Sequence, residues 1–226
     1  ASSGLFAGLN CGYGSSDQGE IVSINRARVA EAMGVPPAAL LTVYQTHSAE
    51  VAVVRDAAQL PEIGKMRADA IVTDQPGIAI AVLTADCQPI LLADAQAGVI
   101  GAVHAGWKGA LSGVIEAAVG AMTDLGARRI RAVIGPSISQ RAYEVSDEFM
   151  DAFLTEDPDH HRFFAGGPNG RPMFDLPSYG LMRLRLHHEP YRSITKPSRW
   201  TPEIVDDILF YSILGVLLGG RLGYCF

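Results

Sequence analysis

Cysteine is scarce in this sequence, because its 226 residues include only Cys11, Cys87 and Cys225. The three are an odd number, lie far apart and form no CxxC pair, so they do not make a disulfide framework. This pattern is typical of a protein from a reducing compartment, and we therefore expect a cytoplasmic location.

Long apolar runs and an excess of basic charge are also lacking. No apolar run reaches the roughly 18 residues that a transmembrane helix needs, and the first residues lack the basic and apolar segments of a signal peptide. The net charge of −6 and the pI near 5.5 argue against a general surface for nucleic acid or anionic membranes. A small anionic substrate held by one local arginine stays compatible with this charge.

Apolar residues make up 48% of the chain, which is enough for a substantial core. Runs typical of strands alternate with runs of helical period. They predict an α/β fold in which helices cover a largely mixed β-sheet, with residues 1–226 as one domain. The expected helices span residues 20–34, 108–126, 146–154 and 175–188. The expected strands lie within residues 40–54, 69–74, 77–85, 89–94, 98–105 and 129–138, and a long polar loop is expected over residues 155–173.

One cysteine and one histidine stand at the ends of two neighbouring strand-like runs, in TADCQPILLAD and GVIGAVHAGWKG. A lone cysteine beside apolar residues is often only a core residue, but the polar residues and the proline around Cys87 favour a strand end at a site. His104 precedes a glycine-rich turn and an expected helix start, whose free N–H groups can bind a phosphate or an oxyanion.

A second histidine, His47, lies in the polar bend YQTHS between two strand-like runs. With Cys87 and His104 it supplies the ligand set of a catalytic zinc, in which three protein ligands leave a fourth place for water or substrate. The alternative needs no metal, because a cysteine beside a histidine base is also a nucleophile pair. The remaining histidines form adjacent pairs in a loop and at a helix end, and we expect all four to be solvated: His160, His161, His187 and His188.

Four ordered segments, QTHS, DAIVTD…GIAIAVLTADCQPILLAD, GVIGAVHAGWKG and IGPSISQRAYEV, together resemble the YfiH-like, laccase-domain family, long labelled multicopper polyphenol oxidoreductases. The resemblance runs from Gly8 to Leu186. It implies an α/β sandwich similar to that of certain deamidating bacterial toxins. It also implies that the active site binds zinc through His47, Cys87 and His104.

The same resemblance implies an enzyme of purine nucleosides, with nucleoside and phosphate as its small-molecule partners. The reactions would be phosphorolysis of adenosine, inosine and methylthioadenosine, with adenosine deamination as a second activity. Some bacterial relatives are instead linked to the editing of peptidoglycan precursors. The residues expected to border the ligand lie in or beside the matching segments: Tyr44, Gln45, Asp69, Trp107, Lys108 and Glu144. An aromatic face suits a purine, and Lys108 or the helix N-terminus could bind phosphate.

The chain departs from the family pattern near both of its ends. Residues 207–226 keep Phe210, Tyr211, Ser212, Gly220 and Arg221 but have Ile213 and Leu214 where the family has polar residues or arginine. This difference puts in doubt any anion-binding role of the family's arginine segment in this chain. The N-terminal strand that is usual in the family is also expected to be missing.

Three classes of function compete at this point. The first is the zinc enzyme, in which a carboxylate near the metal could move protons; the candidates are Asp69, Asp74, Asp86 and Glu144. The second is a copper oxidase, which we disfavour because the next methionine after His104 is Met122 inside an expected helix, and no HxH pair occurs. The third is a metal-free Cys/His hydrolase or a non-catalytic binding module.

Overall fold

The computed structural model describes residues 1–185. Its centre is a five-stranded sheet in the order β2-β3-β6-β5-β7. The strands are β2 (Val51–Val54), β3 (Ala70–Thr73), β6 (Val99–Ala105), β5 (Gln88–Asp94) and β7 (Arg131–Ile134). Within this sheet only β2 and β3 pair in parallel, and the other three pairs are antiparallel, so the predicted mixed sheet is confirmed.

The central strands bury side chains on both faces. Along β3, Ala70 and Val72 point into one apolar cluster, and Ile71 between them points into another. On β6, Val103 points into the first of these clusters and Ala102 into the second. Successive side chains of a strand point to opposite faces, so an almost continuous apolar run is what a strand covered on both faces requires.

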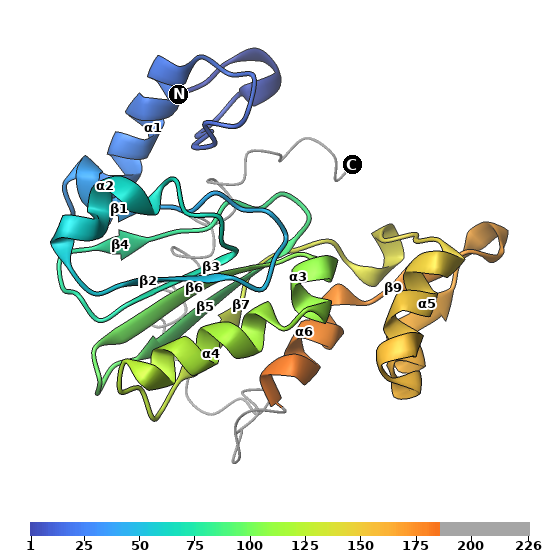
Figure 1. The fold of residues 1–226 in the computed structure, drawn as a ribbon. Coiled ribbons are helices and arrows are strands. Elements are labelled where there is room, and N and C mark those ends of the chain that lie inside the picture. The colour runs from blue at the N-terminus through green and yellow to red at the C-terminus, as the bar shows by residue number, and fades with distance from the viewer. Residues whose placement is uncertain (186–226) are drawn as a thin grey trace, which may run out of the picture.

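Helices cover the first of these faces. Figure 1 shows α4 (Val114–Asp124) running across the sheet, with α3 (Trp107–Leu111) and α6 (Leu176–Arg185) beside it and α5 (Asp147–Glu156) farther out. The Ser146 side chain caps α5 by accepting a hydrogen bond from the Phe149 amide. Arg183 of α6 pairs with Glu116 of α4 and, at 3.3 Å, with Glu156 of α5, which ties the three helices together.

Short strands and a short helix cover the second face of the sheet. A parallel pair, β1 (Leu40–Leu41) and β4 (Ala79–Ile80), packs there with α2 (Leu60–Ile63), and α1 (Gly19–Ala32) lies outside the pair, at the top of Figure 1. Short 3₁₀ turns occur at Gly4–Phe6, Pro37–Ala39, Ala57–Gln59, Gln140–Ala142, Pro158–Phe163 and Pro168–Gly170. Among the helices of residues 1–185, none combines the length and the apolar character that a membrane crossing demands.

Three expectations about local structure were wrong. The single helix expected over residues 108–126 is two helices, because Gly113 adopts φ +93° between α3 and α4. The loop expected over residues 155–173 contains two 3₁₀ turns and most of a hairpin of β8 (Phe164–Gly166) and β9 (Pro172–Phe174). The run 77–85 contains only the two-residue strand β4.

The histidine pair of the 155–173 segment divides between surface and core. His161 is exposed, as expected. His160 is buried, contrary to expectation, because its Nδ1–H donates to the Phe153 carbonyl at 3.1 Å and its ring packs on Tyr179. His187, His188 and residues 207–226 lie outside the described residues.

The positive φ of Gly113 leads to a test of the break between α3 and α4. A side chain in the left-handed region costs about 1–2 kcal/mol, so Gly113→Ala should lower the free energy of unfolding by about that amount. Gly120→Ala is the matched control, because Gly120 is exposed inside α4 with open space around it, and alanine there should stabilise by about 0.5–1 kcal/mol. Urea unfolding of both variants measures the difference. Equal effects of the two substitutions would contradict this account.

Candidate metal centre

The sheet topology brings three distant chain segments together at one end of the strands. The register pairs Val51 with Ala70 and Ala70 with Val103, so the loop before β2 lies beside the end of β6, where His104 stands. β5 runs antiparallel to β6 and pairs Gln88 with Ala105, which places the residue before β5 at the same end. His47, Cys87 and His104 therefore meet, although up to 57 positions separate them in the sequence.

The ligating atoms of these three residues all lie within 4.8 Å of one another. Cys87 Sγ is 3.7 Å from His47 Nε2, and the two imidazole rings stand nearly perpendicular with centroids 4.8 Å apart. A tetrahedral zinc with bonds of about 2.3 Å to sulfur and 2.0–2.1 Å to nitrogen sets its sulfur and nitrogen ligands about 3.6 Å apart. The donor set and the spacing therefore fit such an ion. Within residues 1–185, no other group of three histidine, cysteine, aspartate or glutamate side chains meets this condition.

Gly106 is the residue that leaves room for this arrangement. It is the N-cap of α3, and a Cβ there would lie 2.7 Å from His47 Cδ2 and 2.9 Å from Cys87 Sγ. Atoms that are not bonded do not approach so closely. The glycine therefore lets the backbone pass directly beside the two ligands.

Asp69 lies behind the ligands and is completely buried. Its Oδ1 accepts hydrogen bonds from the His47 amide at 2.9 Å and from His104 Nδ1–H at 2.8 Å. Its Oδ2 accepts from the Thr46 amide at 3.0 Å, the Ser48 amide at 2.7 Å and the Ser48 hydroxyl at 2.8 Å. Burial alone would raise the pKa of this carboxyl, but the hydrogen bonds outweigh burial and hold the pKa well below its usual range.

The two histidines are shifted in opposite directions. Burial lowers the pKa of His47, and the positive charges of His104 and Lys108 lower it further. Burial also acts to lower the pKa of His104, but the hydrogen bonds to Asp69 and Cys87 overcome this and raise it to about 9. Metal ligands must be deprotonated, so a metal ion that binds here has to displace a proton from His104, whereas His47 is already neutral at pH 7.

The residues expected to border the ligand differ in their exposure and in whether their polar groups are already hydrogen-bonded. Tyr44 is 58% exposed, and its ring stacks under Arg67 at 5.5 Å. Gln45 uses both ends of its amide on the backbone of Leu83, at 2.7 Å each, and so ties the His47 loop to the segment before Cys87. Asp69 was expected on this border, but its burial leaves it without an accessible surface.

The remaining border candidates lie around α3 and after β7. The Trp107 ring is half-buried against Phe149, with centroids 4.6 Å apart, and the exposed Lys108 holds its ammonium 5.4 Å from the Trp107 ring. Glu144 is exposed and pairs with Arg171 at 3.2 Å. Trp107 and Lys108 directly follow Gly106 in the sequence, so both stand next to the three candidate ligands. The Glu144 carboxylate, by contrast, is already paired with Arg171.

Among the candidate acids, Asp86 is exposed directly before Cys87. Asp74 follows β3 at its other end, because Thr73 pairs with Ile100 near the start of β6. Sequence reasoning missed Tyr143, whose pKa is raised to about 12 by burial and by the negative charges of Cys87 and Asp86. Its only sequence signal is its place in the segment QRAYEV.

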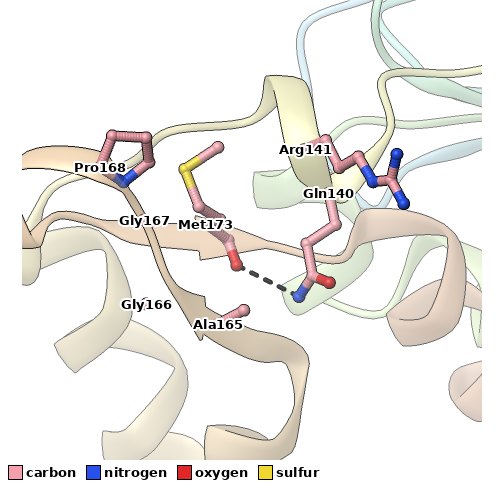
Figure 2. Close-up of a pocket in the computed structure, with 7 residues that line it drawn as sticks. All are labelled: Gln140, Arg141, Ala165, Gly166, Gly167, Pro168 and Met173. Carbon is pink, nitrogen blue, oxygen red and sulfur yellow. Dashed lines mark hydrogen bonds between the residues drawn. The ribbon is translucent and has the colours of Figure 1, made fainter.

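A separate hollow of about 240 Å³ lies between the β8–β9 hairpin and the turn that begins at Gln140. Figure 2 shows the residues that line it. Gln140 crosses it by donating through Nε2 to the Met173 carbonyl at 3.3 Å. The residues that line it are Gln140, Arg141, Ala165, Gly166, Gly167, Pro168 and Met173. The hollow shares no lining residue with the three ligands.

Comparison with known families gives one match over most of the chain. The model of the family described as "Multi-copper polyphenol oxidoreductase laccase" matches residues 1–213. This finding confirms the resemblance seen in the sequence.

Three curated relatives show how the similarity is distributed. "Purine nucleoside phosphorylase ORF3" of Streptomyces griseus is 46% identical over 62% of this chain and 57% of its own length. "Adenosine deaminase RL5" of an unknown prokaryotic organism is 40% identical over 66% of this chain and 59% of its own length. "Purine nucleoside phosphorylase BQ2027_MB2173C" of Mycobacterium bovis is 39% identical over 73% of this chain and 66% of its own length. The chain thus spans about 57–66% of the length of these relatives.

Two solved structures share the fold. The Bacillus licheniformis hypothetical protein YfiH superimposes with a TM-score of 0.74 at 28% identity and covers 82% of this chain and 73% of its own. The Neisseria meningitidis protein NMB0706 reaches a TM-score of 0.71 at 34% identity, with 82% and 74% covered. The predicted α/β class is therefore confirmed by independent structures.

The crowding at Gly106 can be tested without any substrate. Gly106→Ala should lower zinc affinity strongly, because the added methyl group must push His47 or Cys87 out of position. The backbone of Gly106 has φ −67°, which alanine adopts freely, so the free energy of unfolding should change little beyond the cost of this clash. Chelator competition measures the affinity, and Gly120→Ala serves as the control. Wild-type zinc affinity in Gly106→Ala would exclude the close contact.

The raised pKa of His104 predicts how the metal-free protein responds to pH. The imidazolium interacts with Asp69 in the folded state, so its contribution to stability is fully present below about pH 6.5 and is lost as the pH rises through about 9. Urea unfolding of chelator-treated protein should show a falling free energy of unfolding across this window. His104→Gln should flatten the decline, and His161→Gln, at an exposed histidine, should retain it. A free energy that is constant or rises between these values would contradict the ion pair.

Proposed function

The chain belongs to the multi-copper polyphenol oxidoreductase laccase family, and we propose that it is a zinc-dependent enzyme of purine nucleosides. Its reactions are the phosphorolysis of adenosine, inosine and methylthioadenosine and the deamination of adenosine. The observation that carries the proposal is the convergence of His47, Cys87 and His104 with the spacing of a tetrahedral ion. The names of the relatives support the substrate class.

Zinc suits this ligand set better than the copper of the family's description. A blue-copper site adds a long axial bond from a methionine to the two histidines and the cysteine. Met122, the next methionine after His104, is fully buried on α4, and its sulfur packs over Gly101 in the middle of β6. It is therefore not available as an axial ligand. Two imidazoles, one thiolate and a free fourth place are instead the set of a catalytic zinc.

Different residues of the chain would have different roles at such a site. His47, Cys87 and His104 hold the ion, which when bound supplies Lewis acidity toward a substrate oxygen or a water molecule. The Trp107 ring and the exposed Tyr44 ring offer apolar faces to a purine. Lys108 is the group we assign to phosphate, because its charge already acts on His47, and α3, with five residues, is too short for a strong helix dipole.

Proton transfer needs a carboxylate that the substrate can reach. Deamination at C6 adds water and releases ammonia, so one group has to move a proton between the two. Asp69 is sealed from the substrate side by its hydrogen bonds. Asp86, which is exposed beside Cys87, is the acid that we assign to this role.

A metal-free Cys/His hydrolase, including one that edits peptidoglycan precursors, is the second candidate. One observation favours it: the 3.7 Å between Cys87 Sγ and His47 Nε2 is also a hydrogen-bond distance to sulfur. Such a thiol pair would act as nucleophile and base. A cytoplasmic location and a single catalytic domain over residues 1–226 remain predictions under either function.

A nucleoside panel tests the proposed function directly. Zinc-loaded protein incubated with adenosine, inosine and methylthioadenosine should release free base only when phosphate is present, and adenosine should also give inosine without phosphate. Chromatography separates these products. His47→Ala should remove both activities and the bound zinc together, because it deletes a ligand.

The matched control is His161→Ala, which changes an exposed histidine outside the site and should keep zinc and activity. A His47→Ala protein with full activity and no zinc would refute the zinc enzyme and favour the thiol nucleophile. Free base released equally with and without phosphate would point to hydrolysis in place of phosphorolysis.

A further inference from the structure

The Asp69 carboxylate contacts both histidines of the site through different bonds. We infer that Asp69 is a positioning residue that fixes the proton of His104 on Nδ1 and holds the His47 loop in a single conformation. The functional meaning of this role rests on the metal centre proposed above. The hydrogen bonds from which it is argued form without metal or substrate.

The first part of the argument concerns the His47 loop. Three successive amides, those of Thr46, His47 and Ser48, all point at the one carboxylate. This requires an unusual backbone, and His47 has φ +60°, the only positive φ among the non-glycine residues 1–185. A side chain in this region is strained and persists only where its surroundings hold it. The buried charge of Asp69 supplies that hold, and the strained turn aims His47 at Cys87.

The second part concerns His104. Its amide donates to the Asp69 carbonyl at 2.7 Å, and its Nδ1–H donates to Asp69 Oδ1 at 2.8 Å. Two bonds to one residue fix both the backbone and the ring. A carboxylate can only accept, so the proton must stay on Nδ1, and the lone pair of Nε2 is left free for the metal.

The third part explains why the residue must be a carboxylate. Asparagine has the same shape but carries one acceptor oxygen and one donor NH₂. The Oδ2 side of Asp69 receives four donors, the amide and hydroxyl groups of Thr46 and Ser48, so the oxygen of an asparagine should take that side. Its NH₂ would then face His104 Nδ1, which must become the acceptor. The proton of a neutral His104 would move to Nε2, the nitrogen that the metal needs.

The chain contains a matched control for this substitution. Asp94 at the far end of β5 is also buried and accepts four amide hydrogen bonds, from Gln96, Ala97, Arg128 and Arg129. None of its recorded donors is a histidine. Asp94→Asn therefore reproduces the loss of a buried, backbone-bound carboxylate without any effect on the two metal ligands.

The decisive measurement is the tautomer of His104 by ¹⁵N NMR in chelator-treated protein, at a pH where the spectrum shows a single ring proton. Wild type and Asp94→Asn should carry the proton on Nδ1, and Asp69→Asn should carry it on Nε2. In chelator competition, Asp69→Asn should bind zinc about 10–100-fold more weakly than wild type, and Asp94→Asn should bind it as wild type does.

The outcomes separate cleanly. A proton on Nε2 in the wild type would overturn the inference even if Asp69→Asn failed to fold. A proton on Nδ1 in Asp69→Asn, or an equal loss of zinc affinity in both variants, would reduce Asp69 to a purely structural residue. If the wild type bound no zinc but showed the expected tautomers, the proposed zinc function would fail while the positioning role of Asp69 stood.

Discussion

The burial of one ionised carboxylate organises this molecule. An aspartate without access to water must be fully hydrogen-bonded, because an unpaired buried charge is very costly. Asp69 meets this requirement with the backbone of residues 46–48 and the ring of His104. The same bonds that satisfy the charge also join a loop to a central strand. The two histidines of the site are therefore placed by the folding of the core.

The sheet makes this possible by bringing chain segments to one edge in a fixed register. The parallel β2–β3 pair and the antiparallel β3–β6 and β5–β6 pairs direct the His47 loop, Cys87 and His104 to that edge. Asp94 shows what a similar carboxylate does at the opposite edge, where it closes turns through backbone amides alone. Asp69 differs from Asp94 in one added contact, the hydrogen bond between its buried carboxylate and the His104 imidazole.

This contact also gives the two histidines different characters. Burial and nearby positive charge lower the pKa of His47, while the hydrogen bonds to Asp69 and Cys87 raise the pKa of His104. Because metal ligands must be deprotonated, this candidate site would release a proton from His104 on binding a metal ion. Gly106 completes it, because the absence of a side chain lets the helix begin directly beside the ligands.

The sequence by itself determined the five strands of the central sheet, most helices and the identity of the three candidate ligands, because apolar periodicity and residue chemistry are local properties. It did not determine that Asp69 lies behind the ligands, that Gly106 touches them, or that His160 is buried. Those facts depend on contacts between residues far apart in the chain. A carboxylate on the surface and one inside the core look the same in a sequence, and only the tertiary structure decides which donors surround it.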